Sequence, residues 1–460
     1  MKVLLISANT ITEPYPVYPL GLDYVAGALT PRHRARILDL NAETHPAALS
    51  MAVDAFSPDI IGISLRNADT TDITHPKGFW VSHRELVERV RRLSSAPIVL
   101  GGSAFTIFPE KMMEALGADY GIVGEGERLA DLLAAIDSGR DPKGMPGVLV
   151  KGDIGGNLTG IGMELPIPWE KPVIRRFDAT SMHLPYYLSK GGMLNLQTKR
   201  GCPFGCVYCT YPQIEGRRMR LFPPETVART ALELQEAGAR YLFITDSAFN
   251  AEPDHSLAVA KMFRKLKLSI PWGGFFAPTG QSLAYFKELA EAGLTHVEFG
   301  TESLDGEVLK AYGKPFGPET VVASHMAALA AGLHVAHYFL LGGPGETGET
   351  LDRTLSRMEN LKKSVFFVFQ GMRIYPRTAL HQRAVAEGGI PPDRDLLDPV
   401  FYRSLDKSIS SGRIAEKVTA TAKGRLNWVT ASGGADMQRI LSRMYEKGYT
   451  GPLWEYLIRG

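Results

Sequence analysis

Short, continuously apolar segments alternate with amphipathic stretches over the first 140 residues. Segments that are apolar throughout are typical of strands in a parallel sheet that helices cover on both faces. The predicted strands are residues 3–7, 35–40, 60–65, 98–101 and 120–123. The pattern therefore predicts an α/β fold with a doubly wound, Rossmann-like parallel-sheet domain over residues 1–140, in which ligands bind at the carboxyl ends of the strands.

A second alternation begins near residue 191, after a Gly- and Pro-rich stretch that predicts a linker over residues 141–190. Six strand–helix units of this length predict a partial (β/α)6 TIM-like barrel, residues 191–397, with its active site at the carboxyl ends of the strands. Residues 398–460 predict a small helical C-terminal region. The predicted barrel strands are residues 193–199, 241–246, 272–276, 296–300, 334–341 and 365–374.

The overall composition is that of an ordinary globular protein, with 45% hydrophobic residues, 22% charged residues and a formal net charge of +2. Such a weak charge gives no indication of a nucleic-acid partner. The apolar start of the chain ends at Ser7, which is too short for a signal core or a transmembrane segment. We therefore expect a cytoplasmic protein.

All three cysteines of the chain, Cys202, Cys206 and Cys209, lie within eight consecutive positions. An odd and very low cysteine count argues against a disulfide framework and for a reducing compartment. A closed zinc site needs four ligands, and His183 and His255 are far away in sequence, although folding could bring either one close. Thiolates at short fixed spacing are the usual ligands of an iron–sulfur cluster.

The spacing C-x3-C-x2-C resembles the radical S-adenosylmethionine (SAM) superfamily. In that family the three cysteines hold three irons of a 4Fe-4S cluster, and the fourth iron binds the amino and carboxylate groups of SAM. The resemblance also implies SAM contacts at the barrel strand ends, where the glycines are equally consistent with tight turns. These expected SAM-binding residues are Tyr208 beside the adenine, Glu302 and Ser303 at the amino group or ribose, and Gly343 and Gly345 at the adenine or methionine moiety.

The first 140 residues are similar to the cobalamin-binding domain that precedes the barrel in many radical SAM enzymes. The similarity lies in residues 19–27, 101–110 and 124–127. In such domains the cobalamin tail lies in a groove of small residues at the strand ends, although glycines there are also common in tight turns. The expected cobalamin-binding residues are Ser64, Arg66, Gly101, Gly102, Gly124, Glu125 and Gly126.

One departure from other cobalamin proteins is the missing D-x-H-x-x-G motif, which supplies a histidine to cobalt. His33, His45, His75 and His83 all lie in other contexts, so histidine is not expected to hold the lower face of cobalamin. The resemblance would instead bring Arg66 towards the cobalt. Arginine stays protonated and is a poor ligand, so Arg66 could block a sixth ligand. A solvated arginine on a surface loop is the alternative.

The resemblance implies a cobalamin-dependent radical SAM C-methyltransferase, which acts on an unactivated carbon through a 5′-deoxyadenosyl radical and methylcobalamin. An enzyme that uses both cofactors for ring formation, ring contraction or oxidation is the alternative, and a non-catalytic metal or cobalamin sensor is a third hypothesis. With no cysteine beyond the three, relatives that need a second cluster or further catalytic cysteines are excluded. We expect a small-molecule, lipid-precursor or peptide substrate and an electron donor such as flavodoxin or ferredoxin, with the C-terminal region capping the barrel.

Overall fold

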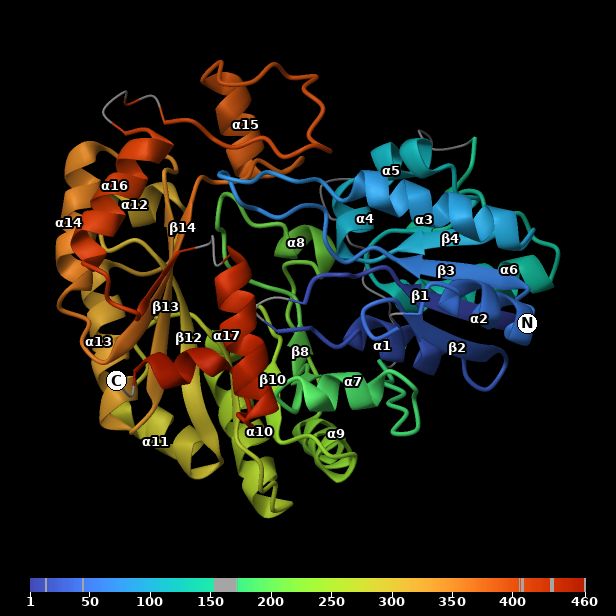
Figure 1. Cartoon of the computed structure of the whole chain (residues 1–460), viewed down its shortest axis with the longest axis horizontal. Coiled ribbons are helices and arrows are strands. Elements are labelled where there is room, and N and C mark those ends of the chain that lie inside the picture. The colour runs from blue at the N-terminus through green and yellow to red at the C-terminus, as the bar shows by residue number, and fades with distance from the viewer. Residues whose placement is uncertain are drawn as a thin grey trace. The chain divides into compact units, whose positions relative to one another are not determined.

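The computed structural model describes residues 1–12, 15–43, 45–152, 171, 173–404, 406, 409–430 and 434–458. The chain forms two units (Figure 1). The first unit contains Met1–Thr70, Lys77–Tyr187 and Thr210–Gly216, and the second contains Thr71–Pro76, Leu188–Cys209 and Arg217–Gly460. Most of the Gly- and Pro-rich segment of the predicted linker, residues 152–168, lies outside the described residues.

The first unit contains a six-stranded sheet in the order β2-β1-β3-β4-β5-β6. Its strands are β1 (Lys2–Ser7), β2 (Arg34–Asp39), β3 (Ile60–Ser64), β4 (Ile98–Gly101), β5 (Tyr120–Ile122) and β6 (Val148–Val150). The first five are parallel, which confirms the doubly wound prediction. The predicted boundary at residue 140 is too early, because β6 pairs antiparallel with β5 and completes the sheet.

Helices of the first unit pack on both faces of this sheet. Helices α1 and α6 contact each other and bury Val3 and Leu5 of β1, while α3 contacts both α2 and α5. In α3 the buried residues His83, Leu86, Val87 and Val90 recur at the spacing of one helix face. The helices are α1 (Leu20–Leu29), α2 (Ala48–Phe56), α3 (Trp80–Leu93), α4 (Ser103–Ile107), α5 (Pro109–Leu116), η1 (Gly126–Arg128), α6 (Leu129–Asp137), α7 (Leu184–Ser189) and α8 (Tyr211–Ile214).

The second unit is built around a parallel sheet in the order β15-β14-β13-β12-β11-β10-β7. Its strands are β7 (Met193–Leu196), β10 (Tyr241–Ile244), β11 (Trp272–Phe276), β12 (Leu294–Glu302), β13 (His334–Leu341), β14 (Ser364–Gln370) and β15 (Trp428–Thr430). The first six confirm the predicted partial barrel. The C-terminal region is mainly helical, as predicted, but it also contains the three-residue strand β15, in which Trp428 packs against Phe366 and extends the sheet.

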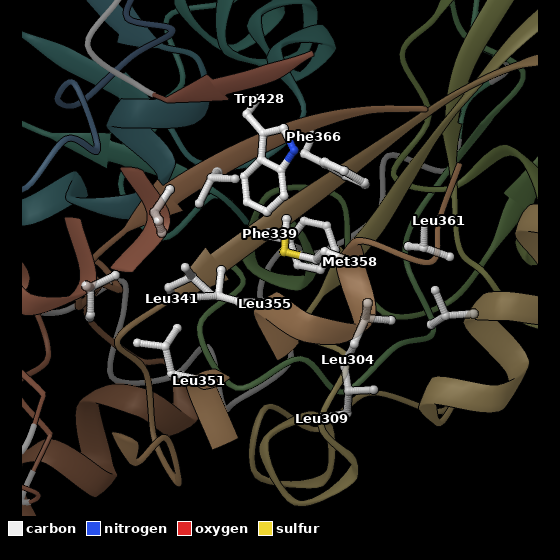
Figure 2. Close-up of a cluster of buried hydrophobic side chains, with 14 of the residues drawn as sticks. Leu304, Leu309, Phe339, Leu341, Leu351, Leu355, Met358, Leu361, Phe366 and Trp428 are labelled. Atoms are coloured by element: carbon white, nitrogen blue, oxygen red, sulfur yellow. The ribbon is translucent and has the colours of Figure 1, made fainter. Parts of the chain in front are cut away.

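Helices α9 (Pro224–Glu236), α10 (Pro253–Lys265), α11 (Leu283–Glu291), α13 (Pro318–Ala330) and α14 (Gly348–Met358) connect the strands and lie along the outer face of the curved sheet (Figure 1). The other helical segments of this unit are η2 (Phe249–Ala251), α12 (Gly306–Ala311), α15 (Ala379–Ala386), α16 (Ser411–Ala422), α17 (Gly434–Glu446) and η3 (Leu453–Leu457). Figure 2 shows the core that results, in which Leu351, Leu355 and Met358 of α14 pack on Phe339 and Phe366 of the sheet.

The segment η3 binds the amino-terminal end of this sheet through a buried ionic network. Glu455 accepts hydrogen bonds from His296 Nδ1 at 2.9 Å and His334 Nδ1 at 2.7 Å, while Trp454 Nε1 donates to Glu298 at 2.8 Å. Burial acts against the charged forms of both groups. Hydrogen bonds from the two histidines nevertheless lower the pKa of Glu455 to about 2. Hydrogen bonds from His296 to Glu298 and Glu455 raise the pKa of His296 to about 9.

Relative to the wild type, Glu455→Gln is expected to lower the free energy of unfolding most strongly between about pH 5 and 6.5. The lowered pKa of Glu455 contributes stability above pH 4.5 that is lost as the pH falls towards 2, and the raised pKa of His296 contributes stability below pH 6.5 that is lost as the pH rises through 9. We expect a loss of about 3 kcal/mol near pH 6, measured by urea unfolding, and a smaller loss at pH 4 and pH 9. An equal loss at all three pH values contradicts the assignment.

Candidate active site

The cysteine loop, residues 201–219, begins directly after a short strand of the second unit. Strand β8 (Lys199–Arg200) pairs antiparallel with β9 (Arg220–Leu221) and closes the base of this loop. The predicted single strand over residues 193–199 is in fact two strands, since β7 ends at Leu196. The loop therefore leaves the sheet at the carboxyl end of β7, where the barrel prediction places an active site.

Asp246, at the carboxyl end of β10, fixes the residues that precede the cysteine loop. Its carboxylate accepts hydrogen bonds from the backbone N–H of Thr198 at 2.8 Å and the hydroxyl of Thr198 at 2.5 Å. Lys199 Nζ donates to the same carboxylate at 2.7 Å, and both side chains of this ion pair are buried. A buried charge pair with this many hydrogen bonds holds its partners in one arrangement.

Gly201 is required by the course of the loop. Its φ is +94°, and a Cβ there would lie 2.2 Å from the carbonyl oxygen of Arg218. The hydroxyl of Ser247 donates to the Gly201 carbonyl at 3.1 Å. Only glycine combines this backbone conformation with so close an approach, so the backbone and the hydrogen bond from Ser247 together fix the residue before Cys202.

The three cysteines are not in disulfides; Cys202 is buried, and Cys206 and Cys209 are half-buried. Burial raises the pKa of Cys206, and the nearby charge of Lys314 opposes that rise. Over the described part of the chain, no three His, Cys, Asp or Glu side chains converge on a single metal ion. Three thiols on one loop are the donor set that an iron–sulfur cluster takes.

A buried cation and a carboxylate lie beside these cysteines. Glu302 Oε1 accepts hydrogen bonds from the hydroxyl of Tyr208 at 2.7 Å and from Lys314 Nζ at 3.1 Å. The same ammonium lies 5.4 Å from the centroid of the Tyr208 ring. Burial disfavours the ammonium, but the charge of Glu302 raises the pKa of Lys314, so the ammonium is charged at neutral pH. Tyr208 and Glu302 were predicted from the sequence, whereas Lys314 was not.

Glu302 has a strained backbone. Its φ is +64°, and the register between β12 and β13 shifts between Gly300 and Glu302. A non-glycine residue in the left-handed region costs on the order of 1–3 kcal/mol, and such residues concentrate at functional sites. The bulge directs the carboxylate of Glu302 to the ammonium of Lys314 and the hydroxyl of Tyr208.

Residues Tyr312–Lys314, which we call the 312–314 turn, brace the cysteine loop. The backbone N–H of Val207 donates to the Tyr312 carbonyl at 3.0 Å. Gly313 has a φ of +72°, and a Cβ there would lie 2.5 Å from the carbonyl oxygen of Gly205. The sequence signal for this turn is the run Tyr-Gly-Lys-Pro at the end of a short helical segment, which gives no indication that the cysteine loop is its partner.

The other residues expected to bind SAM meet clear structural requirements. The hydroxyl of Ser303 bonds to Thr354 at 3.0 Å and accepts from the backbone N–H of Asp305 at 3.1 Å. A Cβ on Gly343 would lie 2.5 Å from the Tyr312 hydroxyl, and Gly345 has a φ of +79°. The tight-turn interpretation of the glycines thus has direct support, while the SAM contacts of all three residues stay predictions.

The glycines of the first unit also meet packing requirements. Gly102 has a φ of +95°, and a Cβ there would lie 2.6 Å from the carbonyl oxygen of Leu65. A Cβ on Gly126 would lie 2.7 Å from Val25 of α1, whereas a Cβ on Gly101 would make only ordinary contacts. Cobalamin binding by these residues, and by Ser64, Gly124 and Glu125, stays a prediction.

A pocket of about 220 Å³ opens in the first unit beside Arg66. The loops after β1 and β3 line it, and this is the point of the sheet where the strand order reverses and ligands commonly bind. Arg66 is accessible to solvent, but the surrounding protein removes part of its hydration and so lowers its pKa. None of the ion pairs among the described residues involves Arg66. Arg66 therefore presents a cation to the pocket.

His83 lines the same pocket, and no local pattern in the chain connects it with Arg66. The histidine is buried, its Nδ1 has no hydrogen-bond partner among the described residues, and burial lowers its pKa to about 4. A neutral imidazole thus lies beside the arginine. The long loop between β3 and α3 separates the two residues in sequence, and only the packing of α3 on the sheet brings them together.

Two family models match the chain: the B12 binding domain over residues 6–134 and the radical SAM superfamily over residues 196–358. Among curated proteins, a tryptophan 2-C-methyltransferase of Streptomyces laurentii is 27% identical over 82% of this chain and 73% of its own length. An uncharacterized methyltransferase of Pyrococcus horikoshii is also 27% identical, over 84% of this chain and 83% of its own. No helix in the described ranges is long and apolar enough to cross a membrane.

Solved structures match the whole chain. The radical S-adenosylmethionine methyltransferase TsrM of Kitasatospora setae, with cobalamin and a 4Fe-4S cluster bound, superimposes with a TM-score of 0.85 at 22% identity and covers 100% of this chain and 97% of its own. The cobalamin-dependent S-adenosylmethionine radical enzyme OxsB superimposes with a TM-score of 0.71 at 16% identity, over 97% of this chain and 71% of its own. These likenesses establish the fold.

Proposed function

Because the chain is a radical SAM enzyme that carries an amino-terminal B12-binding domain, we propose that it is a cobalamin-dependent C-methyltransferase. The observation that carries the proposal is the combination of both domains with a methyltransferase relative that matches 82% of the chain. Its cofactors are a 4Fe-4S cluster, SAM and cobalamin. The whole-chain likeness to TsrM supports this arrangement at the level of fold.

Cys202, Cys206 and Cys209 would hold the cluster, and Arg66 with the strand-end residues of the first unit would contact cobalamin. When bound, the cluster supplies the electron for cleavage of SAM, and cobalamin carries the methyl group. Glu302 would receive the amino group or ribose of SAM, because its carboxylate lies beside the cysteine loop and Tyr208 and Lys314 fix its position. The protein's own task is to orient these groups.

The substrate is a small molecule in our proposal, with a lipid precursor or a peptide side chain as the alternatives. The relatives methylate different compounds: by their names, one acts on C2 of tryptophan and another, from Streptomyces wedmorensis, on a cytidylyl-2-hydroxyethylphosphonate. A flavodoxin or ferredoxin would supply electrons. The likeness to OxsB favours one alternative, a member of the same family that uses both cofactors in a reaction other than methylation.

Product analysis under anaerobic conditions tests the proposal. The reconstituted protein is given cobalamin, a strong reductant, candidate substrates and SAM with a deuterated methyl group, and the products are identified by mass spectrometry. Methyl transfer predicts S-adenosylhomocysteine together with a product heavier by the labelled methyl group. Formation of 5′-deoxyadenosine without S-adenosylhomocysteine would favour the alternative and sink the methyl-transfer proposal.

A further inference from the structure

Lys314 has three partners that belong to the proposed SAM and cluster site. Its ammonium donates to Glu302 at 3.1 Å, lies 5.4 Å from the centroid of the Tyr208 ring, and is close enough to Cys206 for its charge to act on the thiol. We propose that Lys314 is a positioning residue that links the thiolate of Cys206 to the carboxylate of Glu302 and raises the reduction potential of the cluster. The proposal rests on the assignment of the cluster to the three cysteines.

The position of Lys314 is fixed from two sides. On one side, Gly313 approaches the backbone of Gly205 so closely that no side chain fits, which places the 312–314 turn against the cysteine loop. On the other side, the left-handed backbone of Glu302 directs its carboxylate to the ammonium. A chance ion pair on the surface would need neither of these two constraints. The contact between Lys314 and Glu302 is therefore built into the fold.

Burying a charge costs free energy unless the charge is paired. The side chain of Lys314 is only 7% exposed, and an isolated ammonium at such a site would lose much of its hydration. Glu302 supplies one negative charge, and its Oε1 is shared with the hydroxyl of Tyr208. Cysteines bind iron as thiolates, so cluster assembly adds negative charge close to the ammonium of Lys314.

The charge of Lys314 affects how easily the cluster is reduced. Adding an electron to a cluster increases its negative charge, and a fixed positive charge nearby stabilises the reduced form. Hydrogen bonds to the sulfurs and the net local charge are among the factors that set the potential of an iron–sulfur cluster. In a partly buried site the screening by water is weak, so one ammonium has a measurable effect. Lys314 would thus raise the cluster potential and hold Glu302 in place for SAM.

The test compares Lys314→Met with Lys314→Arg and with a matched control, Lys310→Met, in which an exposed lysine of α12 is replaced. Each holoprotein is reconstituted with iron and sulfide, its iron is counted, and the midpoint potential of the cluster is measured by redox titration followed by electron paramagnetic resonance. We expect full iron and a more negative potential for Lys314→Met, a smaller shift for Lys314→Arg, and none for Lys310→Met. Full iron with an unchanged potential in Lys314→Met overturns the proposal.

Loss of the cluster from Lys314→Met would make its potential unmeasurable, and Glu302→Gln then provides the decisive measurement. That variant removes a negative charge and leaves the ammonium, so its potential is expected to become more positive; an unchanged potential overturns the proposal. Both measurements are made before SAM is added. If the wild-type protein assembles no cluster, the cluster assignment fails, whereas normal wild-type behaviour with unshifted variants refutes only the role of Lys314.

Discussion

Replacement of Cys202, Cys206 and Cys209 by alanine together is expected to remove the bound iron and abolish SAM cleavage, while cobalamin binding persists. The reason is that the chain contains no other cysteine to hold a cluster. The first unit, which carries the predicted cobalamin residues, has its own sheet and its own hydrophobic core. Iron and cobalamin contents of the anaerobically reconstituted variant, measured beside the wild type, check the expectation.

Two outcomes of this experiment have different meanings. If the variant still cleaves SAM, the assignment of the three cysteines is wrong. If cobalamin is lost together with iron, the circular dichroism spectrum decides whether the variant is folded. A folded variant that binds neither would show that cobalamin binding depends on the cluster, contrary to the expectation of an independent first unit.

Asp246→Ala is expected to reduce the free energy of unfolding of the second unit by about 3–5 kcal/mol, because it leaves the ammonium of Lys199 buried without its carboxylate. The substitution also removes the acceptor for both hydrogen bonds from Thr198. Since these residues lead into the cysteine loop, we expect weaker retention of the cluster as well. Urea unfolding of the apoprotein and the iron content after reconstitution measure the two effects separately.

Asp352→Ala is the matched control for this variant. Asp352 pairs with Lys417 at 2.5 Å, but its side chain is 62% exposed, so water screens the ion pair. Exposed pairs contribute about 0–1 kcal/mol, and the control is expected to change the stability by no more than that. Similar losses in the two variants would mean that the burial of the Lys199–Asp246 pair does not determine its effect.

Much of the fold follows from local patterns. The runs of apolar residues predicted every parallel strand of the first unit and six of the seven in the barrel sheet, because strands buried on both faces need continuous apolar sequence. The short strands β6 and β15 were missed. Each lies outside the two stretches of alternating strands and helices from which the other strands were predicted, and each forms through pairing with a neighbour that the local sequence does not identify.

For the candidate site, the local pattern was enough to predict the chemistry: three cysteines at this spacing, with no others, predict one cluster of a radical SAM enzyme. Only the tertiary structure brought Lys314 to Cys206 and Glu302, and His83 to the pocket beside Arg66. The physical reason is the range of the interactions. Ligand spacing along a loop is local, whereas these contacts join residues whose approach depends on glycine-permitted turns, a strand bulge and helix packing.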